Sequence, residues 1–138
     1  MENKYNDSTA QRPEGDRLID AALVPIDLPL FMEQIKEETP WREGDRNAIT
    51  VFKTNGLRIV LIALHKDVEM TRHTADGIIS LKVLEGRLQF YTDRQSVQLC
   101  KDQMLVLHER IPHSVFAVDE TVFLLTLTTA SAIESTHL

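Results

Sequence analysis

From residue 47 onward the chain is a series of short apolar and β-branched runs separated by turn signals. The clearest hairpin signal is Thr54-Asn55-Gly56, which lies between the runs 48–53 and 57–65. The remaining runs have similar lengths, and they are 77–84, 87–92, 96–99, 103–107, 113–118 and 121–128. Eight short strands at this spacing predict a closed sandwich or barrel, with no βαβ alternation and no glycine-rich phosphate loop.

The run 57–65 is apolar on both faces of the predicted strand. One face carries Leu57, Ile59, Leu61 and Ala63, and the other carries Val60, Ile62 and Leu64. Both faces must therefore be shielded from water by packing against other parts of the structure. One face would point into the barrel, and the other would pack on a helix, a second sheet or another subunit. Because one short helix covers only part of a sheet, we expect a homodimer through a sheet face.

Before residue 47 the pattern predicts one short helix. Asp27 is the expected N-cap, Pro29 falls in the first turn, and the segment 37–40 ends the helix. The expected apolar face of this helix consists of Leu28, Phe31, Met32 and Ile35. Trp41, the only tryptophan, is expected to form a lid over one end of the barrel.

The chain divides into one barrel and three flanking segments. We expect a frayed arm at 1–17, a helix and lid segment at 18–46, the barrel at 47–129 and a tail at 130–138. With 138 residues there is room for one domain.

Charge and composition exclude several function classes. The net charge of −6 argues against a nucleic-acid partner, since phosphate binding needs clustered cations. No apolar stretch approaches the roughly 20 residues that span a bilayer, so no membrane partner is expected. The single cysteine, Cys100, rules out a disulfide framework within the chain and favours a cytoplasmic location. Five histidines remain to carry chemistry.

Two segments carry a resemblance to a known family. The first runs from His73 to Val83-Leu84-Glu85-Gly86, and the second from Asp102 to Pro112-His113 and the strand that follows. Together they resemble the two motifs of small single-domain cupins, and the likeness covers roughly 40 to 128. The resemblance implies a mostly β, double-stranded β-helix or jelly-roll barrel of the RmlC-like kind, preceded here by one short helix, with a site in its mouth.

The same resemblance implies candidate metal ligands. Metal-binding cupins usually carry two histidines and a glutamate in the first motif and another histidine in the second. His73 matches the first histidine and His113 the last. Counting back from Gly86, the glutamate position falls on Ile79, and the other histidine position on Thr74 or Ala75. The second motif also departs from the family at Asp102, His108 and Arg110, which stand in the places of glycine, proline and glycine.

A non-haem iron site needs two imidazoles and a carboxylate, and here the carboxylate position is apolar. His65, Asp76 and Glu69 stay open as sources of a third ligand. The sequence specifies no cofactor with certainty, and a divalent transition metal at His73 and His113 stays open.

Three functions are open at this stage. The first is a small-molecule-binding barrel without an assigned reaction, in which His73 and His113 orient a ligand. Its expected apolar lining is Ile79, Leu81, Val83, Val115 and Ala117. The second is a metal-dependent dioxygenase or isomerase of the cupin type. In a metal-free variant of the fold, that of sugar epimerases, a histidine acts as general base, and Asp76 is then the nearest acid partner. The third is a dimeric structural or regulatory module without a ligand.

Overall fold

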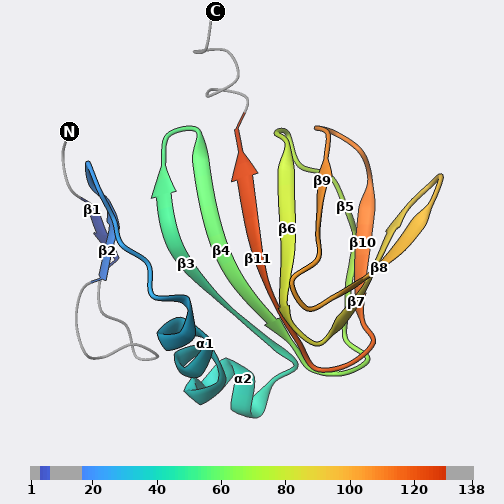
Figure 1. The fold of residues 1–138 in the computed structure, drawn as a ribbon, viewed down its shortest axis with the longest axis horizontal. Coiled ribbons are helices and arrows are strands. Elements are labelled where there is room, and N and C mark those ends of the chain that lie inside the picture. The colour runs from blue at the N-terminus through green and yellow to red at the C-terminus, as the bar shows by residue number, and fades with distance from the viewer. Residues whose placement is uncertain (1–3, 7–16, 130–138) are drawn as a thin grey trace, which may run out of the picture.

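The computed structural model describes residues 4–6 and 17–129, and these form two facing antiparallel sheets with two helices at one side (Figure 1). One sheet has the strand order β3-β4-β11-β6-β9 and the other β5-β10-β7-β8, while β1 and β2 form a separate ribbon. The elements are β1 (Lys4–Asn6), β2 (Arg17–Asp20), α1 (Leu28–Glu37), α2 (Thr39–Glu43), β3 (Arg46–Thr54), β4 (Leu57–Leu64), β5 (Glu69–His73), β6 (Ile79–Glu85), β7 (Arg87–Thr92), β8 (Ser96–Cys100), β9 (Met104–Leu107), β10 (His113–Ala117) and β11 (Thr121–Thr128).

The space between the two sheets is filled by one apolar core, as the alternation along the strands predicts. Val60, Ile62 and Leu64 of β4 face this core, and Leu61 and Ala63 face the opposite side of the sheet. The other buried members of the inner core are Leu81, Val83, Leu88, Phe90, Leu99, Val115, Ala117 and Phe123. The mostly β sandwich or barrel expected from the sequence is confirmed.

The outer face of the five-stranded sheet has its own core, covered by α1 and α2. Ile35 of α1 and Trp41 of α2 pack against Ile49, Leu61 and Val122, and the exposed fraction of each is below a tenth. The helices contact β3 and β4. The expected cap of the first helix is present, since Asp27 Oδ1 accepts a hydrogen bond of 3.3 Å from the Leu30 N–H.

Two details of the helical segment differ from the sequence-based expectation. The first helix ends at Glu37 as expected, but a second short helix begins at Thr39, with Pro40 in its first turn, where a missing N–H costs nothing. Trp41 does not cover a barrel end. It packs on the outer face of the sheet, because the turn at Glu38 directs α2 onto that apolar surface.

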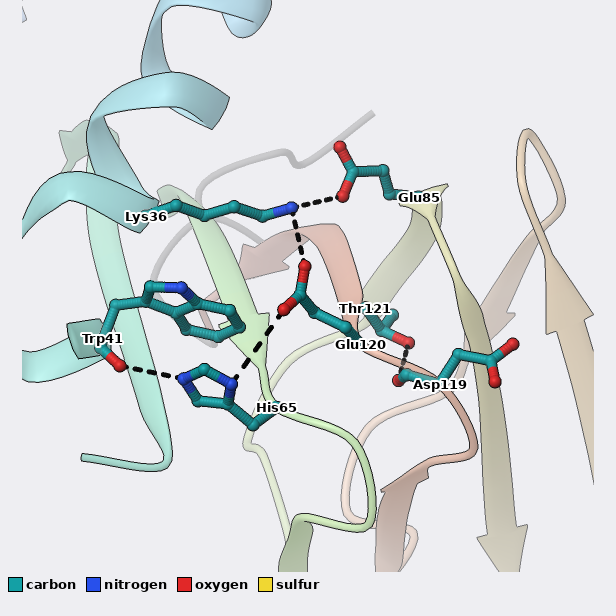
Figure 2. Close-up of polar contacts among 7 residues, drawn as sticks. All are labelled: Lys36, Trp41, His65, Glu85, Asp119, Glu120 and Thr121. Carbon is teal, nitrogen blue, oxygen red and sulfur yellow. Dashed lines mark hydrogen bonds and ion pairs between the residues drawn. The ribbon is translucent and has the colours of Figure 1, made fainter. Parts of the chain in front are cut away.

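A small polar network links the helices to the end of the barrel at which β4 and β6 end (Figure 2). Lys36 Nζ lies 2.6 Å from Glu85 Oε2 and 3.0 Å from Glu120 Oε2. The His65 ring stacks on the Trp41 indole, with centroids 3.5 Å apart, and its Nε2–H donates to the Trp41 carbonyl over 2.8 Å. Four separate segments of the chain therefore meet at this corner.

Three strands lie where the sequence predicts none. β5 is polar and exposed along most of its length, so it has no apolar alternation, and its antiparallel pairing with β10 places it in the four-stranded sheet. β1 and the first residue of β2 fall within the segment expected to be an arm. Residues 7–16 of that arm and the 130–138 tail lie outside the described residues. Within the described part of the chain, no helix combines the length and apolar character needed to cross a membrane.

Two residues that replace motif glycines keep a glycine-like backbone. Asp102 has a φ of 70° and Arg110 a φ of 60°, both in the left-handed region. Gly86 itself has a φ of 87°, and a Cβ there would lie 2.1 Å from the Glu120 carbonyl oxygen. The turns of the motif are thus retained in shape even where their residues differ.

We expect apolar packing, rather than the ion pairs, to hold the helices on the sheet. Trp41→Ala should lower the free energy of unfolding by about 3–5 kcal/mol, the usual cost of removing a buried tryptophan side chain. Lys36→Met should change it by no more than about 1 kcal/mol, because its carboxylate partners are partly exposed to solvent. Urea denaturation of both variants checks this. A larger loss for Lys36→Met than for Trp41→Ala would contradict it.

Candidate functional site

Two histidines 40 positions apart in sequence meet at the end of the barrel opposite the polar network. His73 ends β5 and His113 begins β10, and the antiparallel register pairs the two residues directly. Their ring centroids lie 4.3 Å apart at an interplanar angle of 61°. The pairing of the two motif histidines expected from the resemblance is therefore present as a contact.

The backbone fixes which ring nitrogen carries the proton in each histidine. Nδ1 of His73 lies 2.8 Å from the Thr71 carbonyl oxygen, and Nδ1 of His113 lies 2.9 Å from the Ile111 carbonyl oxygen. A carbonyl oxygen only accepts, so both Nδ1 atoms donate, and the neutral rings are Nδ1–H tautomers. Within the described part of the chain, the Nε2 atom of neither ring has a hydrogen-bond partner. The site thus presents two imidazole acceptors side by side.

His113 is the buried member of the pair. Its exposed fraction is 5%, and its ring stacks on Phe90 with centroids 5.4 Å apart. Burial lowers the pKa of His113, and the neighbouring His73 lowers it further, while the hydrogen bond to Ile111 opposes both effects. His113 is accordingly held in its neutral form at neutral pH.

A cavity of about 450 Å³ opens beside the histidine pair. Its apolar wall consists of Ile79, Leu125 and Leu127, and its remaining lining residues are His73, Thr74, Ala75, Asp76, Gly77, His113, Thr128 and Thr129. The Thr129 hydroxyl is buried, and it has no hydrogen-bond partner among the described residues. An apolar wall with a few convergent polar groups is the usual composition of a small-molecule site.

One edge of the cavity is fixed by a close contact between two strands. The Ile78 N–H donates to Thr128 Oγ1 over 3.0 Å, and the Thr128 N–H donates to the Ile78 carbonyl over 3.0 Å. Gly77 is required beside this contact, because a Cβ there would lie 1.6 Å from the Thr128 carbonyl oxygen. The Thr128 hydroxyl also donates to the Ile78 carbonyl, so its proton is already used within the protein.

The structure brings only some of the predicted site residues together. His73, His113, Ile79 and Asp76 all line the cavity. Leu81 and Val115 do not: they are buried deeper between the sheets, where side chains fill the barrel interior. Val83 and Ala117 lie in the same core.

Neither His65 nor Glu69 reaches the histidine pair. His65 lies in the opposite corner, stacked on Trp41, with its Nδ1 4.0 Å from Glu120 Oε1 (Figure 2). Glu69 is at the other end of β5 from His73, opposite Phe116. Chain direction explains both placements, because β4 ends and β5 begins at the end of the barrel away from the cavity.

Several lining residues carry no sequence signal of their own. The lining residues Leu125 and Leu127, and Phe90 behind the His113 ring, have the pattern of ordinary core positions, and the Thr71 and Ile111 carbonyls that orient the rings are backbone atoms. The alternation along β11 could have placed Leu125 and Leu127 on the inner face. Their position at the cavity follows only from the register of β11 with β6.

The donor set does not match a resident metal centre of the cupin type. Within the described residues, no group of three or more histidine, cysteine, aspartate or glutamate side chains is placed to hold a metal ion. The glutamate position of the motif is Ile79, which is 3% exposed and apolar. His73 and His113 could supply two ligands, but two neutral imidazoles leave the charge of a dication uncompensated. No step of chemistry is therefore assigned to a metal.

Comparison with solved structures identifies the architecture. The chain superposes on a conserved protein of unknown function from Streptococcus pyogenes with a TM-score of 0.63 and 24% identity, covering 80% of this chain and 90% of that one. A cupin-2 domain protein from Shewanella frigidimarina gives a TM-score of 0.61 at 17% identity, covering 75% and 93%. A cupin superfamily protein from Desulfitobacterium hafniense gives 0.61 at 15% identity, covering 64% and 81%.

These likenesses show that the chain has the cupin fold, and at these identities they show the fold alone. No family model and no curated protein sequence matches the chain. The expected cupin-type barrel is thus confirmed by shape, and a fold of this kind does not by itself define a function.

The depressed pKa of His113 predicts a loss of stability in mild acid. An unfolded chain takes up the proton near the ordinary histidine pKa of about 6.5, whereas the folded chain resists it, so stability falls as the pH drops below that value. His113→Gln should lose less stability between pH 7.5 and 5.5 than the unchanged protein.

Urea denaturation at the two pH values measures this difference. His108→Gln, at an exposed histidine, is the matched control and should keep the original pH dependence. The pKa values of Asp45 and Asp119 are lowered from 3.8 by their Arg46 and Arg87 partners, and these groups act at lower pH. An identical loss in the unchanged protein and in His113→Gln would contradict the assignment.

Proposed function

We propose that this cupin-fold chain binds a small molecule in the cavity beside His73 and His113, with the two imidazoles as the groups that orient it. The observation that carries the proposal is the pair itself: two adjacent rings, each anchored through Nδ1 to a backbone carbonyl and each with an uncommitted Nε2. A ligand that donates a hydrogen bond to either Nε2 would use an acceptor that no described residue occupies. No reaction is assigned.

The geometry favours this proposal over a metal-dependent enzyme. The carboxylate of a three-ligand centre is absent, and the residues suggested as substitutes are separated from the pair, apart from Asp76 at the cavity edge. General-base catalysis would need an acid partner for a histidine. Within the described residues neither Nε2 contacts a carboxylate, so the pair is better suited to orienting a ligand than to proton transfer.

Two matched variants test the binding site. His73→Phe removes one acceptor from the cavity, and His108→Phe makes the same change at an exposed histidine that does not line it. A fragment library containing neutral, cationic and anionic compounds is screened by ligand-observed NMR. We expect fragments that bind the unchanged protein to lose about tenfold in affinity with His73→Phe, equivalent to one hydrogen bond, and to keep it with His108→Phe. No binding at millimolar concentration, or equal binding to both variants, would overturn the proposal.

We also propose that the chain forms a homodimer through the outer face of the five-stranded sheet. The helices cover β3 and β4, but the far edge of the same face carries Met104, 54% exposed, and Val106, 66% exposed, on edge strand β9. These side chains stand beside Lys82 and Ser80 of β6. An exposed apolar pair on the part of the outer face that the helices leave uncovered supports self-association through that face.

Val106→Glu should dissociate such a dimer, because it places a charge within the exposed apolar pair on β9. Val97→Glu is the matched control, since Val97 is an exposed valine of β8 in the other sheet. Light scattering coupled to size-exclusion chromatography measures the mass of each variant. A monomeric mass for the unchanged protein at micromolar concentration would refute the dimer and leave the ligand site untouched.

A further inference from the structure

The described polar side chains that line the cavity offer more free hydrogen-bond acceptors than donors. Nε2 of His73 and Nε2 of His113 accept, because both Nδ1 protons are committed to backbone carbonyls. Asp76 adds a carboxylate, which also only accepts when ionised. The hydroxyl of Thr128 is already engaged with Ile78. Among the described lining residues, the Thr74 and Thr129 hydroxyls are the side-chain donors that are left.

The cavity also lacks a positive side chain. None of the described residues that line it is a lysine or an arginine. Arg72, next to His73, is held in a bidentate pair with Asp93 at 2.6 and 2.9 Å. Arg110 bonds the Ala75 carbonyl through its backbone N–H, and its side chain is exposed outside the lining. A carboxylate or phosphate ligand would therefore meet two acceptors and one negative charge without a cation to compensate it.

Building on the small-molecule function proposed above, we infer that the ligand is a cation, specifically a small primary amine with a short apolar body. A protonated amine has three donors and no acceptor, so it suits the two Nε2 acceptors, and the exposed Asp76 at the cavity edge supplies the opposite charge. Its carbon chain would lie against the wall of Ile79, Leu125 and Leu127. The net charge of −6 favours the approach of the same class of ligand.

The test compares three probes that share a four-carbon chain and differ in charge: butylammonium, 1-butanol and butyrate. Each is titrated at neutral pH while the Cε1–Hε1 resonances of His73 and His113 are followed by two-dimensional NMR. We expect butylammonium to bind at least about fivefold more tightly than butanol, as one partly screened opposite charge implies, and butyrate to bind more weakly than butanol.

Asp76→Asn isolates the contribution of the carboxylate. It should reduce the advantage of butylammonium over butanol to within about twofold. Asp102→Asn is the matched control: it removes an exposed carboxylate from the β8–β9 turn, where asparagine also tolerates the φ of 70°. This control should keep the original preference, which separates Asp76 from the general negative charge of the protein.

The outcomes distinguish this inference from the proposed function. If butyrate binds as well as butylammonium, or if Asp76→Asn leaves the preference intact, the amine class is wrong and the ligand site stands. If the fragment screen finds compounds that depend on His73 but none of the three probes moves the histidine resonances, the amine class is again wrong. If neither the fragments nor the probes bind, the ligand site itself is refuted.

Discussion

The five-stranded sheet has two apolar faces, and the rest of the fold follows from the need to cover both. The four-stranded sheet covers the inner face and creates the core between the sheets. The helices α1 and α2 cover part of the outer face, with Ile35 and Trp41 as the buried contacts. Because burying apolar area is the dominant favourable contribution to folding, this double cover fixes where the four-stranded sheet and the two helices lie.

The covering arrangement separates the two ends of the molecule. The helices, His65 and the Lys36 network gather at one corner, where β4 ends and β6 ends (Figure 2). The cavity opens at the other end, where β5 and β11 end. Among the described residues both helices lie at the closed corner, and at the open end the register of β5 with β10 brings the two histidines together.

The histidine pair has no glutamate in the motif position where a metal site would carry one. A glutamate beside two histidines would supply charge for a metal, but Ile79 supplies an apolar wall instead. Each imidazole then directs its Nε2 away from the backbone carbonyl, two residues earlier in the chain, that binds its Nδ1. Because Ile79 and Thr74 or Ala75 occupy two of the four ligand positions implied by the cupin resemblance, the mouth keeps only His73 and His113 of that set.

Much of the fold was determined by the sequence itself. Alternation along β4 assigned its two faces correctly, because the side-chain period of a strand is independent of what covers it. The motif segments predicted the cupin-type barrel and the meeting of His73 with His113. Turn shape also survived substitution, since Asp102 and Arg110 keep left-handed backbones in the places of glycines.

Only the tertiary structure decided the remainder. β5 is polar, so nothing but its backbone pairing with β10 marks it as a strand. Alternation along a strand shows which face a residue lies on, but not how far it lies from the mouth of the barrel. Leu81 and Val115 lie deep in the core, whereas Ile79, on the same inner face, lines the cavity. Trp41 packs on an apolar surface that distant segments of the chain form together, and His65 stacks on Trp41. Local sequence sets which side of a strand is apolar, whereas the register between strands sets which residues meet.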